Sequence, residues 1–106
     1  MKFDIDEILA DMLMAIKRVV KDNWKNVKDN ANIYLQDRRN RLELLASLRL
    51  DKEIKEEFFQ KRLKDEQKIL ESELHSIAIM SKAIAQKAAN AAFDVLDKAI
   101  STALKL

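Results

Sequence analysis

The residues best suited to chemistry in this sequence are a carboxylate and the only histidine, one helical turn apart. His75 follows Glu71 by four residues, which places both side chains on one face of a helix. Carboxylates and imidazoles on facing helices build the di-iron sites of helical bundles, where Glu-x-x-His is the recurring spacing. Ser72 stands where that spacing requires Glu. Glu71 and His75 are therefore candidate metal ligands, but an ordinary surface pair explains them as well, and we predict no metal or other cofactor.

Other catalytic chemistry has no recognisable basis in the sequence. The chain has no Cys, which removes disulfides, thiolate metal ligands and Cys nucleophiles together. It also has no Gly, so a Gly-rich phosphate-binding loop cannot form. No nucleophile, base and orienting group stand at a spacing that catalysis would need. We predict that the protein is not an enzyme.

A row of basic residues in the N-terminal half is a candidate for binding nucleic-acid phosphates, with Trp24 available for stacking. Its members recur every three or four residues: Lys17, Lys21, Lys25 and Lys28. Acidic residues interrupt the row, and 20 Lys and Arg against 18 Asp and Glu leave a net charge of only +2. A nearly neutral chain lacks a bulk attraction for nucleic acid or anionic membranes. We therefore expect a solvated helix face here and consider nucleic acid an unlikely partner.

The elements that carry these residues are predicted to be helices throughout. The chain is 48% hydrophobic and 36% charged and lacks both Gly and Pro, a composition typical of long helices and coiled coils. Asp4 and Glu7 form a capping box, and Phe3 and Ile8 form a hydrophobic staple, so a helix should begin at about Ile5. Apolar residues then recur at steps of three and four. Four Asn residues between 23 and 32 weaken the pattern, and a kink near residue 30 is one alternative.

One reversal of the chain is indicated between residues 45 and 59. Asp51 is a candidate N-cap, and Glu53, Glu56 and Glu57 place negative charge in the first turns of a new helix. The segment resembles the helix–turn–helix of short bacterial SHOCT-like segments, and Lys52 and Lys55 stand where that family has Gly and a capping hydroxyl. The resemblance implies a turn and no activity. It rests on Leu45, Leu48, Asp51, Ile54, Glu56, Glu57 and Phe59.

These patterns predict one all-α domain, 1–106, folded as a long antiparallel hairpin with helices at about 5–49 and 53–104. Each arm would be about 70 Å long at 1.5 Å per residue. Residues whose numbers sum to about 104 should face one another, for example Arg38 and Glu66, or Tyr34 and Leu70. A single uninterrupted helix in a coiled coil is the competing interpretation.

One seam cannot hide all the apolar residues of the second arm, so we expect a homo-oligomer, with a dimer forming a four-helix bundle as the simplest case. Trp24 and Phe58 lie off the seam and are candidates for partner contacts. The expected function is a non-enzymatic self-association or protein-interaction module. A metal-binding bundle of the ferritin-like kind is the first alternative, and a nucleic-acid-binding hairpin is the second. The N-terminus lacks a signal-peptide pattern and no apolar run is long enough to span a membrane, which favours the cytoplasm. The residues expected in the dimer interface are Ile77, Ile84, Ala88, Ala92, Val95 and Ala99.

Overall fold

The first helix begins where the sequence predicts. The computed structural model describes residues 3–77 and 80–105 of the chain. Helix α1 spans Ile5–Val20. The Asp4 side chain accepts hydrogen bonds from the backbone N–H groups of Asp6 (3.0 Å) and Glu7 (3.2 Å), which satisfies two donors that the first turn leaves free. The predicted N-cap is therefore confirmed.

The chain reverses directly after α1, although no Gly or Pro marks a turn. Lys21 takes a positive φ of 50°, and its backbone N–H bonds the carbonyl of Lys17. The short 3-10 helix η1 spans Lys21–Asn23, and helix α2 (Trp24–Asp37) then runs back along α1.

Helix α3 (Arg39–Leu50) continues α2 with a bend at Arg38. The backbone N–H of Arg38 bonds the Tyr34 carbonyl (3.1 Å), and the Arg38 carbonyl accepts from Leu42 (2.9 Å). Because helical hydrogen bonds persist on both sides of the bend, α2 and α3 act as one bent rod.

The predicted reversal after α3 is present, but its geometry differs from the prediction. Asp51 is the C-cap residue of α3, and Lys52 adopts a left-handed φ of 60°. The Glu53 N–H bonds the Leu48 carbonyl (2.9 Å) and the Lys52 N–H bonds the Arg49 carbonyl (3.0 Å). These two bonds form a Schellman motif, the common way in which a helix ends. The next helix, α4, begins later than predicted and spans Glu56–Ile77.

A last helix, α5, spans Lys82–Leu104 and runs antiparallel to α4. Its N-cap is Ser81, whose hydroxyl accepts a hydrogen bond from the Ile84 N–H (3.2 Å). The sequence analysis placed Ser81 inside a continuous helix, so this helix start is a correction.

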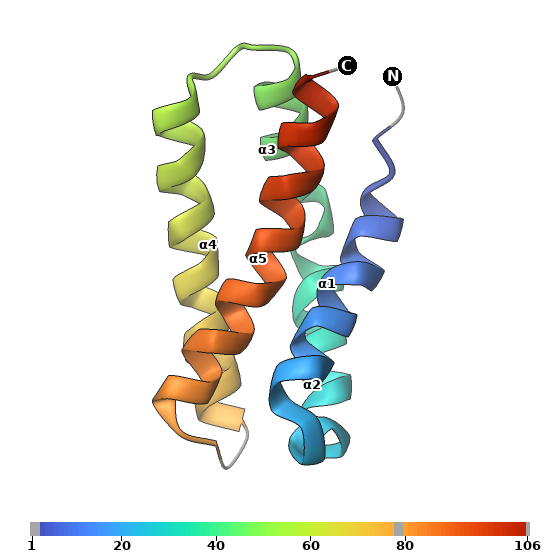
Figure 1. The fold of residues 1–106 in the computed structure, drawn as a ribbon, viewed down its shortest axis with the longest axis vertical. Coiled ribbons are helices and arrows are strands. Elements are labelled where there is room, and N and C mark those ends of the chain that lie inside the picture. The colour runs from blue at the N-terminus through green and yellow to red at the C-terminus, as the bar shows by residue number, and fades with distance from the viewer. Residues whose placement is uncertain (1–2, 78–79, 106) are drawn as a thin grey trace.

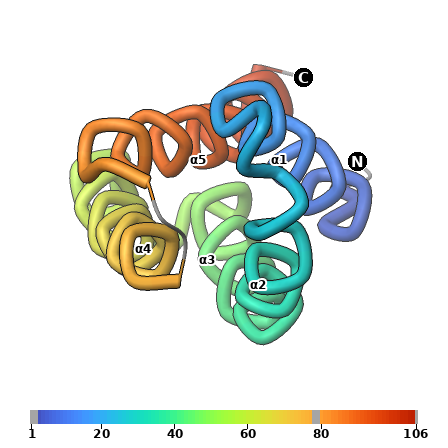
Figure 2. The backbone as a smooth tube through the Cα atoms, turned by 90° about the horizontal axis from the view of Figure 1, so that it is seen from below, coloured from blue at the N-terminus to red at the C-terminus, as the bar shows by residue number. Residues whose placement is uncertain are grey.

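The rods pack side by side as an up-and-down bundle. In Figure 1, α1 and α4 run downward while the α2–α3 rod and α5 run upward, and both chain ends lie at the top. Seen along the bundle axis, the rods are arranged around it in the order α1, α2–α3, α4 and α5 (Figure 2). The residues that the structure describes thus form four rods in one chain, measuring 40 × 23 × 21 Å.

The all-α prediction is confirmed, but the structure differs from the predicted hairpin. The arms expected as continuous helices over 5–49 and 53–104 are each divided near the middle, first at Lys21–Asn23 and again between Ile77 and Lys82. No kink occurs near Asn30, which lies within α2. Burial explains the difference, because four rods in one chain enclose apolar faces that a hairpin with a single seam would leave in water.

The halves of the two predicted arms still lie beside each other, since α1 packs on α5 while the α2–α3 rod lies beside α4. Arg38 forms its expected ion pair with Glu66, at 3.1 Å. Tyr34 lies one turn from its expected partner Leu70 and donates its hydroxyl to the Glu66 carbonyl (3.1 Å). Of these two example pairs, Arg38 and Glu66 therefore lie together as expected, whereas the Tyr34 hydroxyl bonds Glu66, four residues before Leu70.

The residues predicted for a dimer interface pack within this one chain. Ala88 and Ala92 have no exposed surface and belong to α5, which packs more extensively on α1 than on any other helix. The others are partly buried against the same core: Ile77, Ile84, Val95 and Ala99. While the bundle is closed, Ala88 and Ala92 are not available to a second chain.

Candidate functional site

The two candidate metal ligands lie together, but no third candidate ligand lies beside them in the part of the chain that the structure describes. Glu71 and His75 are one turn apart on α4, where Glu71 is half-buried and His75 is exposed. Across residues 3–77 and 80–105, no three His, Cys, Asp or Glu side chains are grouped closely enough to hold a metal ion. The two residues therefore have the arrangement of a surface i, i+4 pair.

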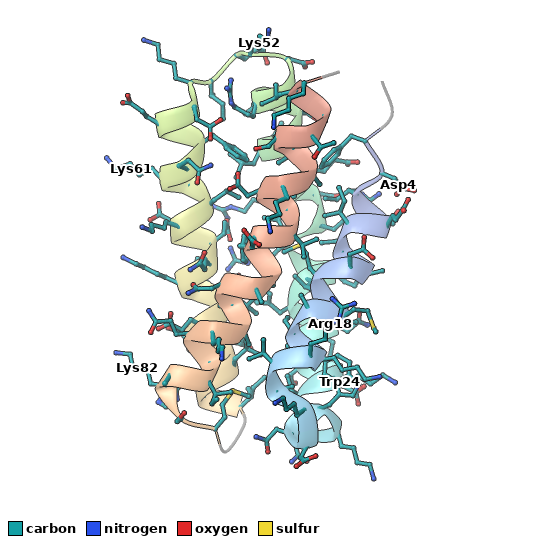
Figure 3. The ribbon with its side chains drawn as sticks, in the orientation of Figure 1. Asp4, Arg18, Trp24, Lys52, Lys61 and Lys82 are labelled. Carbon is teal, nitrogen blue, oxygen red and sulfur yellow. The ribbon has the colours of Figure 1, made fainter. Side chains whose placement is uncertain are left out.

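The basic row is divided by the first reversal of the chain. Lys17 belongs to α1 and Lys21 to η1, whereas Lys25 and Lys28 belong to α2, and all four are exposed. Trp24 begins α2 and packs partly against the core, near the lower end of the bundle in Figure 3. The row is thus not one continuous helical stripe.

Neighbouring rods are joined closely on most sides of the bundle. Gln60 on α4 donates to Asp97 on α5 (2.9 Å), and Gln67 on α4 bonds Asn90 on α5. Arg39 on α3 binds both carboxylate oxygens of Asp6 on α1, at 2.6 and 3.1 Å. Small alanines let α5 approach α1 closely.

The side between the α2–α3 rod and α4 is held by a polar cluster around Glu66. This carboxylate is 4% exposed, and it pairs with Arg38 (3.1 Å) and Arg41 (2.8 Å). The Arg38 guanidinium also lies 5.4 Å from the centre of the Tyr34 ring, close enough for a cation–π contact. Burial raises the pKa of Tyr34 to about 12, against a smaller opposing effect of the positive charge on Arg38. The cluster fixes the register of the two rods.

Next to this cluster, an open groove of about 580 Å³ runs between α3 and α4. Its apolar walls include two of the five exposed large hydrophobic side chains in the described residues, Leu44 (60% exposed) and Phe58 (51%). Arg41 and Arg62 lie at its polar edge. The full lining is Asn40, Arg41, Leu44, Leu45, Leu48, Phe58, Arg62 and Glu66.

Two further exposed side chains extend this apolar surface along the same side. Ile33 (57% exposed) precedes Leu44 by 11 residues on the α2–α3 rod, and Ile69 (40%) follows Phe58 by 11 residues on α4. Eleven residues are three helical turns, so each pair lies in one row, with about 16 Å between its members. Because the rods are antiparallel, Leu44 and Phe58 share one end of this side, and Ile33 and Ile69 share the other.

We call this surface the open face. It comprises Ile33, Asp37, Arg41 and Leu44 on the α2–α3 rod, together with Phe58, Arg62, Asp65 and Ile69 on α4. Phe58 is a candidate contact residue on the sequence alone, and in the structure it lies on this face. The other three apolar residues could not be predicted, because a spacing of 11 residues stands out only once the inner face of each helix is known.

No protein-family model, curated protein or solved structure matches this chain. In the part of the chain that the structure describes, no helix combines the length and the apolar character needed to cross a bilayer.

Proposed function

We propose that the protein is a non-enzymatic helical interaction module that binds a protein surface, either a second copy or another chain, through the open face. The observation that supports this proposal most strongly is the position of the exposed apolar residues. Of the five large hydrophobic side chains that are exposed in the described residues, four lie on this face, and the fifth is Met14 on α1.

Clustering distinguishes this surface from ordinary exposure. Single exposed apolar residues are normal on soluble proteins, whereas a contiguous apolar patch with a polar rim marks an interaction site. The open face has both features, since Leu44 and Phe58 flank a groove whose edge carries Arg41 and Arg62. Aromatic and Arg side chains are also the types most enriched in the centre of protein interfaces.

A rigid support favours the same function. Glu66 pairs with two arginines from the opposite rod, and the Tyr34 hydroxyl bonds the backbone of α4 beside it. These contacts hold the two walls of the groove at a fixed spacing. A preorganised surface loses less conformational entropy when a partner binds.

The proposal is tested by placing a photo-cross-linking amino acid at position 44 and, in a matched variant, at position 14. Leu44 and Met14 are both long, exposed apolar residues, but only Leu44 belongs to the open face. Irradiation in cells, followed by mass spectrometry, should give protein adducts at position 44 and few at position 14. Equal yields at the two positions, or no adducts at position 44, would contradict the proposal.

A further inference from the structure

We infer that the occupant of the open face is a second copy of this chain, bound antiparallel about a two-fold axis; this inference rests on the proposed function. The arrangement of side chains on the face carries the inference. Starting from the end nearest the α3–α4 loop, the α2–α3 rod presents Leu44, Arg41, Asp37 and Ile33. From the same end, α4 presents Phe58, Arg62, Asp65 and Ile69.

Both rods therefore give the same order: apolar, basic, acidic, apolar. A two-fold axis that lies in the plane of the face, perpendicular to the rods, reverses this order in the second copy. The basic row of one copy then meets the acidic row of the other, which places Arg62 opposite the second copy's Asp65, and Arg41 opposite its Asp37. The apolar ends meet as well. A two-fold interface must be self-complementary in this way.

The charge balance of the face favours a second copy over an acidic partner. Within the face, two basic residues stand against two acidic ones: Arg41 and Arg62 against Asp37 and Asp65. A surface built for an acidic helix would carry an excess of positive charge. Here the charges are balanced in number and segregated into rows, so a copy in the reversed direction fits. A parallel copy would place arginine against arginine.

The shape of the face agrees with the charges. In the antiparallel arrangement, the second copy's Ile33 and Ile69 lie over the end of the face that contains Leu44, Phe58 and the groove. Exposed isoleucines then fill an apolar groove of about 580 Å³, and the symmetry provides this contact twice. The narrower side of the molecule is 40 by 21 Å. A side of this size can accommodate an interface near the standard of about 800 Å² for each partner.

The test exchanges charges on α4, where Asp65 is exposed, Arg62 is partly exposed, and the two interact only weakly with each other, at 4.0 Å. In R62D, both charged rows of α4 are acidic, and in D65R both are basic. Each variant should dimerise at least about tenfold more weakly than the unmodified chain, because like charges face each other across the axis. An equimolar mixture of the two variants should form a 1:1 heterodimer. The double variant R62D/D65R, which restores complementarity, should dimerise with itself.

Sedimentation equilibrium measures these associations, and circular dichroism confirms that each variant is folded. The matched control reverses the charges of Asp94 and Lys98, an exposed ion pair of 2.9 Å on α5. Because α5 does not belong to the open face, this change should leave dimerisation unchanged. An unmodified chain that stays monomeric at about 1 mM, well above typical interface Kd values, would overturn the inference. Failure of the mixed variants to associate would also overturn it. If the inference fails but position 44 still cross-links to a different protein, the proposed function stands. If position 44 gives no protein cross-links at all, the inference and the proposed function are both contradicted.

Discussion

The end of α3 depends on one lysine in a conformation that suits glycine better. Lys52 has a φ of 60° and occupies the C′ position of the Schellman motif. For a residue with a Cβ atom, this left-handed region costs roughly 1 to 2 kcal/mol.

We predict that Lys52→Gly stabilises the protein by about 0.5 to 1 kcal/mol, because relief of the left-handed strain exceeds the added entropy of the unfolded chain. Chemical denaturation measures the difference. The matched control is Lys61→Gly, since Lys61 is an exposed lysine inside α4. That change should destabilise the protein by about 1 kcal/mol. Equal destabilisation by the two variants would show that residue 52 is not left-handed.

The only tyrosine gives a second prediction at this scale. Burial disfavours the phenolate of Tyr34 and raises its pKa from 10.0 to about 12. In the unfolded chain the proton leaves near pH 10, while the folded chain still holds it. The contribution of Tyr34 to stability is therefore complete below pH 10 and is lost as the pH rises from 10 towards 12.

Absorbance of the tyrosinate near 295 nm should show this directly, because no other tyrosine contributes. We expect a midpoint near pH 12 for the native protein, or a cooperative alkaline unfolding below it. In denaturant the midpoint should lie near 10. Tyr34→Phe should flatten the loss of stability above pH 10, and an ordinary midpoint in the folded chain would contradict the burial of the hydroxyl.

At the scale of the elements, the tightest packing lies between α1 and the alanine face of α5. Ala85, Ala88, Ala89 and Ala92 of α5 are fully buried, and so are the large residues Met12 and Ile16 of α1. Small residues on one helix let large side chains of the other fit between them. Ala88 and Ala92, which the sequence predicts at a contact between chains, are therefore buried inside the one chain.

Ala92→Leu should consequently destabilise the folded monomer by about 1 to 3 kcal/mol, since the added methyl groups have no space between the helices. Thermal and denaturant unfolding measure this loss. Ala83→Leu provides the control, because Ala83 is exposed near the start of α5 and should tolerate the larger side chain. A change in association without a change in unfolding free energy would indicate that Ala92 contacts a second chain after all.

The elements also show how far the sequence could predict this fold. The start of α1 was predictable because Asp4 and Glu7 form a local signature, and the turn after Leu50 was predictable from the acidic residues that follow. The reversal at Lys21 was not, because a lysine with positive φ carries no turn signal. An apolar repeat of three and four residues also continues unchanged when a helix is cut and folded back, so periodicity could not separate the hairpin from the bundle.

The open face could not be predicted from the sequence for a related reason. Leu44 and Ile33 look like core residues in a sequence dominated by Leu, Ile and Ala. Only the packing of Leu42 and Leu45 inside the bundle shows that Leu44 points outward. Phe58 could be singled out because its neighbour Phe59 already fits the inner stripe, and the structure buries Phe59 and exposes Phe58.

At the scale of the whole molecule, folding each arm in half turns a rod of about 70 Å into a bundle 40 Å long. The Cα radius of gyration is 13.5 Å, close to the roughly 13 Å expected for a compact domain of this length. The bundle thereby hides within one chain the alanine face of α5 that a hairpin would have to share with a partner. Four of the five large hydrophobic side chains that stay exposed in the described residues lie on the open face, so the proposed dimer has one side-by-side geometry.

That geometry makes a prediction for small-angle X-ray scattering over a series of concentrations. Two copies joined through the open face lie side by side, so one short dimension, 23 or 21 Å, is doubled while the 40 Å length is unchanged. As the scattering mass doubles, the radius of gyration should rise only from 13.5 Å to about 17 Å, as expected for two compact domains roughly 22 Å apart. End-to-end pairing would give about 24 Å, because the centres would lie about 40 Å apart. The R62D variant, in which like charges weaken dimerisation, should leave 13.5 Å only at concentrations at least about tenfold higher than the unmodified chain requires. A rise to the larger value in the unmodified chain would place the contact at the ends of the bundle, away from Leu44 and Phe58.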